Sequence, residues 1–217
     1  MTGLIALIII GALVIRAVYT NYDELDEIPE KLGNQLGKLW EIAHQGMREN
    51  KLLRAEKALL TILKIDEKNA AAYNRLGILY AKQKEYADAI DCFEIASSIE
   101  ISASSLHNLG LIYYETGNYT KAAVAFEDAI QLEGDLATRH IAYAKCLEKL
   151  GNNKKMISEL EKACELEPTR ETMLLLQKAY ELNGDSESAY KIQKSINKTH
   201  STVGRPKKVN RPKRVVV

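Results

Sequence analysis

An internal repeat of 33 residues between Ala70 and Gly134 constrains this chain more than any other feature. Seven small or apolar positions of the first copy recur 33 residues later in the second. Within each copy these positions are mostly three or four residues apart, which is the period of an α-helix. Such self-similarity indicates one supersecondary unit stacked on its copies. The two sets are Tyr73, Leu76, Gly77, Tyr80, Ala89, Phe93 and Ala96, and Leu106, Leu109, Gly110, Tyr113, Ala122, Phe126 and Ala129.

Each copy divides into two helical halves around a short turn. The turn falls at Lys84-Glu85 in the first copy and at Thr116-Gly117-Asn118 in the second, where the glycine is a helix stop signal. The unit is therefore predicted to be a helix, a tight turn and a second helix. Gly77 and Gly110 have no side chain, so we expect them at close, equivalent contacts between consecutive hairpins, with phenylalanines filling the space between layers.

The seven positions resemble the tetratricopeptide repeat, which has an aromatic residue, Leu-Gly and Tyr on its first helix and Ala, Phe and Ala on its second. The resemblance covers residues 36–196 and implies an all-α, right-handed superhelical solenoid of about five helix-turn-helix repeats. The last helix is polar, as a solvated end of a solenoid requires. The predicted repeats are 36–69, 70–102, 103–136, 137–169 and 170–196.

By the geometry of this repeat, the fifth, ninth and twelfth positions of each first helix face a concave groove. The residues there combine aromatic and aliphatic side chains with a few hydrogen-bond donors, which suits an extended or helical peptide from a protein partner. The predicted groove residues are Trp40, His44, Asn74, Ile78, His107, Leu111, Tyr114, Ile141, Lys145, Leu174 and Lys178.

Motifs for catalysis, metals and cofactors are missing from the sequence. The four histidines are scattered, and none has a histidine or cysteine four residues away, so no metal ligand set is predicted. Neither of the glycine-rich phosphate-binding patterns is present. The three cysteines are odd in number and form no C-x-x-C pair, which favours buried thiols in a reducing compartment. We therefore predict a non-catalytic protein without a cofactor or a metal.

The N-terminus contains an unbroken apolar run from Leu4 to Ile15. Extended over Gly3 to Tyr22, with Arg16 as its one charge, a helix would be about 30 Å long and could span a bilayer. We predict that residues 1–22 are a single-pass membrane anchor. A cleaved signal peptide is the alternative, but a basic start and a small-x-small cleavage site are missing. The basic residues after the span place the body on the cytoplasmic side by the positive-inside rule.

The charge of the chain is unevenly distributed. Its formal net charge is +1, but the segment 197–217 carries seven Lys and Arg residues and no acid, which leaves −6 on residues 1–196. An acidic juxtamembrane linker is predicted at 23–35, and a disordered basic tail at 197–217.

Within this tail, Gly204-Arg205-Pro206 resembles the core of an AT-hook, which lies in the minor groove of A·T-rich DNA. Three interpretations stay open, namely binding to DNA or RNA, binding to anionic lipid, and no partner at all. The candidate polyanion-binding residues are Arg205, Lys207, Lys208, Arg211, Lys213 and Arg214.

Together these features predict a membrane-tethered tetratricopeptide scaffold that binds a protein in its groove. The layout resembles membrane-anchored repeat proteins with which bacteria assemble envelope complexes. The alternative is a nucleic-acid-associated protein whose tail holds DNA near the membrane.

Overall fold

The computed structural model describes the backbone of residues 32–203 and side chains through Lys198. This part of the chain is entirely helical and divides into two compact units, one ending at Ile99 and the other beginning at Glu100. We call them the N-terminal unit and the C-terminal unit and describe each by itself. The predicted anchor (1–22), most of the linker (23–31) and residues 204–217 of the tail lie outside the described residues. None of the described helices has the length and apolar character to cross a membrane.

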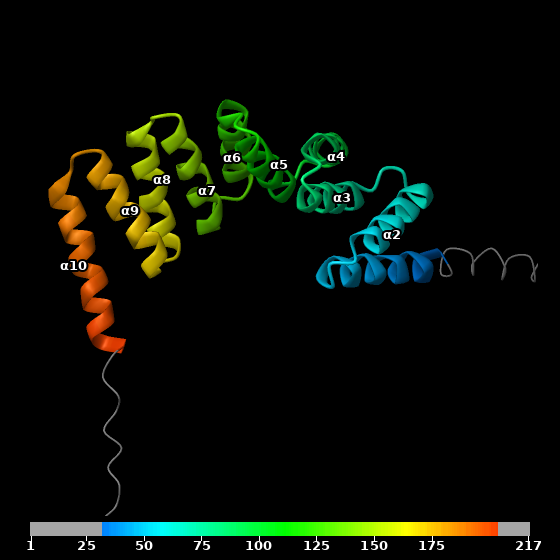
Figure 1. The fold of residues 1–217 in the computed structure, drawn as a ribbon, viewed down its shortest axis with the longest axis horizontal. Helices are drawn as coiled ribbons and strands as arrows, with labels where there is room; N and C mark the ends of the chain where they lie inside the picture. The colour runs from blue at the N-terminus through cyan, green and yellow to red at the C-terminus, as the bar shows by residue number, and fades with distance from the viewer. Residues whose placement is uncertain (1–31, 204–217) are drawn as a thin grey trace, which may run out of the picture. The chain divides into compact units, whose positions relative to one another are not determined.

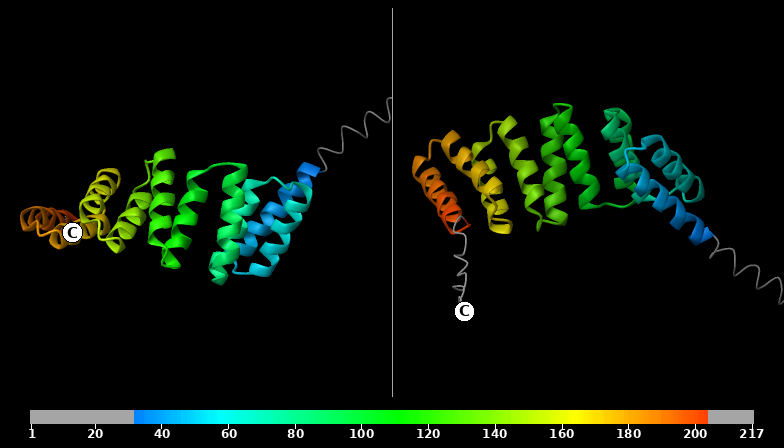
Figure 2. Two further views of the ribbon diagram at one scale, coloured as in Figure 1. Left: turned by 90° about the horizontal axis from the view of Figure 1, so that it is seen from above. Right: turned by 60° about the horizontal axis from the view of Figure 1, so that its bottom comes forward.

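Antiparallel helix hairpins form both units (Figure 1). The N-terminal unit has two hairpins, and the C-terminal unit has three hairpins that lie side by side in sequence order (Figures 1 and 2). In the N-terminal unit the helices are 32–48, α2 (Leu52–Ile65), α3 (Ala70–Gln83) and α4 (Tyr86–Ile99). In the C-terminal unit they are α5 (Ala103–Glu115), α6 (Tyr119–Leu132), α7 (Ala137–Lys149), α8 (Asn153–Leu166), α9 (Arg170–Leu182) and α10 (Ser186–Val203).

Short polar side chains start most of these helices. A side-chain oxygen accepts a hydrogen bond from the backbone N–H three residues later, which satisfies one of the unpaired donors of the first turn. The residues that cap in this way are Asn69, Ser102, Asn118, Asn152, Thr169 and Asp185.

The turn inside every described hairpin contains one residue with positive φ. Glycine holds this place in three hairpins, at Gly117, Gly151 and Gly184, with φ between 71° and 78°. In the first two hairpins Asn50 and Lys84 hold it, with φ of 58° and 65°. A left-handed backbone disfavours side chains with a Cβ atom, so Lys84 is a strained position that the sequence does not reveal.

Two glycines lie where an added side chain would collide with a phenylalanine of the neighbouring helix. A Cβ atom built on Gly77 would lie 2.7 Å from the Phe93 ring, and one on Gly110 would lie 2.7 Å from the Phe126 ring. The two contacts are equivalent, as predicted. Both, however, join the two helices of one hairpin, so the expectation that they lie between consecutive hairpins is wrong. The ring of each second helix fills the space that the glycine of its own first helix leaves open.

The core of the N-terminal unit gathers apolar residues from all of its helices. Trp40, predicted to face a groove, packs against this core. The C-terminal end also differs from expectation. Helix α10 continues to Val203, so residues 197–203, which were assigned to a disordered tail, are helical.

A candidate peptide-binding groove

A groove with a volume of about 730 Å³ opens on the C-terminal unit. Helices α5 and α7 form its walls, and the loop before α9 with the first turn of α9 closes one side. The lining residues are His107, Leu111, Tyr114, Glu115, Phe126, Thr138, Ile141, Ala142, Lys145, Glu167, Thr169, Arg170, Glu171 and Thr172.

Helical periodicity explains why these side chains converge. His107, Leu111 and Tyr114 are spaced by four and three residues on α5, and Ile141 and Lys145 by four on α7. Residues at these spacings share one helix face. The parallel placement of α5 and α7 in successive hairpins then directs both faces into the same groove.

His107 provides the most unusual group of the groove. Its ring packs against Phe126, with ring centroids 5.5 Å apart. Its Nδ1 atom is buried and has no hydrogen-bond partner among the described residues. Burial lowers the pKa of His107 below 6.5, and the nearby charge of Arg139 lowers it further. The imidazole is therefore neutral near pH 7 and offers an acceptor or a donor to a guest.

The rest of the surface mixes apolar and charged groups. Leu111 is 38% exposed and lies with Ile141 on the apolar part of the lining. Lys145 has no ion-pair partner within the described range and so presents a free ammonium group at the groove. This combination can hold an apolar side chain and fix its orientation with a few polar contacts.

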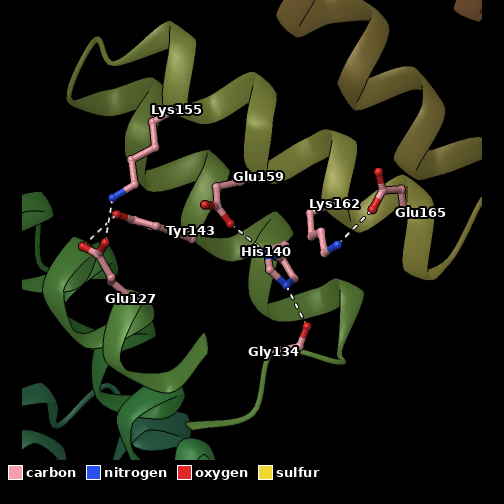
Figure 3. A network of polar contacts seen from close by, with 8 residues as sticks. All are labelled: Glu127, Gly134, His140, Tyr143, Lys155, Glu159, Lys162 and Glu165. Carbon is pink, nitrogen blue, oxygen red and sulfur yellow. Dashed lines mark hydrogen bonds and ion pairs between the residues drawn. The ribbon is translucent and has the colours of Figure 1, made fainter. Parts of the chain in front are cut away.

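A clamp at the start of α7 positions one wall of the groove. Arg139, whose side chain is 4% exposed, donates hydrogen bonds to the backbone oxygen and the carboxylate of Glu133, at 2.7 and 2.8 Å. His140 lies 2.7 Å from Glu159 through Nδ1 and 3.0 Å from the Gly134 oxygen through Nε2 (Figure 3). The Glu159 carboxylate and the Gly134 backbone oxygen are both acceptors. The ring can therefore donate a hydrogen bond to both of them only when both of its nitrogen atoms carry protons.

A second set of contacts connects α6, α7 and α8. Lys155 donates to Glu127 at 2.7 Å, and the Tyr143 hydroxyl donates to the same carboxylate at 3.2 Å (Figure 3). The hydrogen bond from Lys155 lowers the pKa of Glu127, and burial raises the pKa of Tyr143. These contacts hold the second helices behind α7 and touch no residue of the groove lining.

The structure brings five of the eleven predicted groove residues into this one groove, namely His107, Leu111, Tyr114, Ile141 and Lys145. The two predicted residues of α9 do not line it. Leu174 is 46% exposed, and Lys178 pairs with Glu148 of α7 at 3.0 Å.

The four predicted residues of the N-terminal unit lie as follows. Trp40 and His44 form an aromatic pair, with ring centroids 5.9 Å apart. Asn74 and Ile78 are half-buried on α3.

Sequence reasoning missed the part of the groove that α9 contributes. Thr169, Arg170 and Glu171 stand at the very start of a repeat, a position that the rule for helix faces does not select. The sequence feature that could have indicated these residues is the N-cap threonine, Thr169, because it marks the start of α9 and its exposed first turn. No group of three or more His, Cys, Asp or Glu residues in the described part of the chain could hold a metal ion.

The stacked helix hairpins and the groove that first helices line define a helical-repeat protein. Tetratricopeptide repeat family models match residues 68–132 and 137–170. These two segments of the chain therefore belong to the tetratricopeptide repeat family. No curated protein matches it.

Several solved structures are similar to the chain. One of MamA shares 21% identity with a TM-score of 0.70, covering 80% of this chain and 98% of that one. Another, MamA from residue 41 to its end from Desulfovibrio magneticus RS-1, shares 14% identity with a TM-score of 0.70, covering 79% and 98%. A third, YrrB, is described as a TPR protein with an unusual peptide-binding site. It shares 20% identity with a TM-score of 0.61, covering 71% and 80%. At these identities the likeness establishes the fold.

Proposed function

We propose that this protein is a non-catalytic scaffold that binds a peptide segment of another protein in the groove between α5, α7 and the start of α9. The observation that carries the proposal is the convergence of Leu111, Ile141, His107 and Lys145 on one open surface. Tetratricopeptide repeat proteins generally act through protein binding, and the description of YrrB as a protein with a peptide-binding site supports the same role.

The groove favours a guest with one apolar anchor and adjacent polar groups. Leu111 and Ile141 can cover an aliphatic or aromatic side chain, which is where most of the binding free energy of such interfaces arises. Neutral His107 can exchange a hydrogen bond with the guest backbone, and Lys145 can pair with a carboxylate. A guest that brings a carboxylate to Lys145 gains a charge-assisted hydrogen bond.

Site-specific crosslinking tests this role. A photoreactive amino acid replaces Tyr114 in the full chain, and crosslinked partners are identified in cells of the source organism. Adding Leu111→Arg or Lys145→Glu should reduce the yield of the specific partner about tenfold or more, which corresponds to the loss of one anchor contact. Val124→Arg is the matched control, because Val124 lies on α6, is 56% exposed and does not line the groove. An identical partner yield in all three variants would place partner binding elsewhere.

We also propose that residues 1–22 tether the scaffold to a membrane with its body on the cytoplasmic side. The support is the apolar run and the absence of a cleavage site in the sequence. Protease added outside intact cells should leave the body undigested. Digestion of the body from outside would reverse the topology, and recovery of the full chain in the soluble fraction would exclude the tether.

The basic tail gives the alternative function, in which the protein associates with nucleic acid. Its support is the Gly204-Arg205-Pro206 sequence with its flanking basic residues. Because α10 extends to Val203, a deletion of 204–217 removes the candidate contacts and leaves the described helices intact. Loss of DNA retention with a steep salt dependence in the full chain would support this alternative. If the deletion of 204–217 abolishes binding to vesicles of anionic lipid but does not affect DNA retention, the tail binds the membrane surface. If the deletion changes neither DNA retention nor vesicle binding, the tail has no polyanion partner.

A further inference from the structure

The outward face of α2 carries apolar and basic residues in one stripe. Leu53 and Leu60 are 63% and 41% exposed, and they are seven residues apart, so they lie on the same side of the helix. Lys57 and Lys64 are four residues after each of them and are also exposed. A surface helix of this kind has an apolar side that nothing in the described residues covers.

A shallow groove of about 440 Å³ runs beside this stripe within the N-terminal unit. Helix 32–48 forms one wall and α2 the other, and Figure 1 shows the two helices packed together. Both charged residues of the groove, Arg54 and Lys57, are cations. Neither forms an ion pair within 4.0 Å among the described residues, although the charge of Arg54 helps to lower the pKa of Glu49. The lining residues are Leu39, Ile42, Leu53, Arg54, Lys57, Ala58 and Thr61.

An occupant of matching chemistry precedes this groove in the same chain. Residues 23–30 read Asp-Glu-Leu-Asp-Glu-Ile-Pro-Glu, with five carboxylates and two aliphatic residues, Leu25 and Ile28. We propose that this acidic segment docks in cis on the α2 groove, with Leu25 and Ile28 on the apolar floor and the carboxylates on Arg54 and Lys57. The segment is eight residues long, so it spans about 26 Å when extended.

The chain can reach the groove without a long connection. The described helix begins at residue 32, and Leu39 is seven residues further along the same helix, or about 10 Å. A reversal of the chain before residue 32 would bring the acidic segment back along the helix that forms one wall. Because the segment is tethered so close to the groove, its effective concentration is in the millimolar range, at which weak contacts are sufficient.

Disulfide trapping in the full-length protein tests this docking. Leu25→Cys is combined with Leu53→Cys, with Cys164→Ser to remove the half-buried native thiol. The matched control combines Leu25→Cys with Lys82→Cys, because Lys82 is exposed in the same unit on α3 and outside the groove. Mild oxidation should form an intramolecular disulfide about tenfold faster in the Leu53 pair than in the control pair.

Charge-reversal variants distinguish specific docking from random collision of the two cysteines. Lys57→Glu should slow formation of the Leu53 disulfide about two- to fivefold, as expected for an exposed ion pair, and Asp26→Lys in the same protein should restore it. Equal rates in the Leu53 and control pairs would overturn the proposal. A disulfide-linked dimer instead of the intramolecular product would also overturn it, by showing that a second copy supplies the segment.

Discussion

The substitution Gly77→Ala tests whether the glycine–phenylalanine contact controls hairpin packing. The new methyl group would lie 2.7 Å from the Phe93 ring, well inside the usual contact distance of carbon atoms. Phe93 is 1% exposed and its ring is rigid, so it cannot move aside without disturbing the core. Overpacking of this kind costs about 1–3 kcal/mol, and the better helix propensity of alanine returns about 1 kcal/mol. We expect a net loss of up to about 2 kcal/mol in the free energy of unfolding.

Urea unfolding followed by tryptophan fluorescence is the appropriate assay. Trp40 is the single tryptophan of the chain. It packs against the core that both hairpins of the N-terminal unit share, so its emission reports the unfolding of that core. The midpoint should fall by up to about 1 M urea. Gly37→Ala is the matched control, because a Cβ atom there meets nothing within 4 Å and should raise stability by up to about 1 kcal/mol.

The outcome that refutes the reasoning is a stabilised Gly77→Ala protein, with a midpoint that rises as in the Gly37→Ala control. That result would show that Phe93 yields at no cost and that the glycine is not required for close approach. A further check is Gly77→Ala combined with Phe93→Leu, where the smaller side chain should remove most of the penalty for the added methyl group.

Three further predictions concern single side chains. Lys84→Gly should raise stability by about 1 kcal/mol in urea unfolding, because φ is +65° at this position, and an unchanged or lower midpoint would contradict it. The pKa of His107 is lowered by burial and then by Arg139, so the unfolded state binds more protons below pH 6.5 and stability should fall as pH drops through that value. The variant His107→Gln should show a smaller drop between pH 7.5 and 5.5, and an equal drop would exclude this origin. Burial raises the pKa of the Cys146 thiol to about 11. Iodoacetamide at pH 8 should therefore modify half-buried Cys164 first, as measured by peptide mass spectrometry. Faster labelling of Cys146 would contradict its buried position.

Local sequence patterns were sufficient to predict the helix hairpins and the residues that make their close contacts, but not which helices these contacts join. The 33-residue spacing between Gly77 and Gly110, and between Phe93 and Phe126, placed equivalent residues on equivalent helix faces. In the structure Gly77 meets Phe93, and Gly110 meets Phe126. The assignment of these contacts to neighbouring hairpins was wrong, because periodicity states which face a residue occupies but not which of two packed neighbours covers it.

The groove was only partly predictable for a related reason. The rule for helix faces located His107 and Lys145 correctly on the lining, since face and spacing follow from helix geometry. It failed for Trp40, which packs against a core, and for Lys178, which pairs with Glu148. Whether a side chain on the correct face stays open depends on what the neighbouring hairpin presents to it.

The amino-acid sequence by itself determined the repeat length, the helix hairpins and the small residues at close contacts, because these depend on spacing within about 33 residues of chain. Only the packed structure decided which predicted residues share a groove and how α7 is held. Arg139 and His140 take their partners from the loop before α7 and from α8. Contacts of this kind depend on the angle between successive hairpins. Many small packing contacts together set this angle, and the sequence of a single repeat does not reveal it.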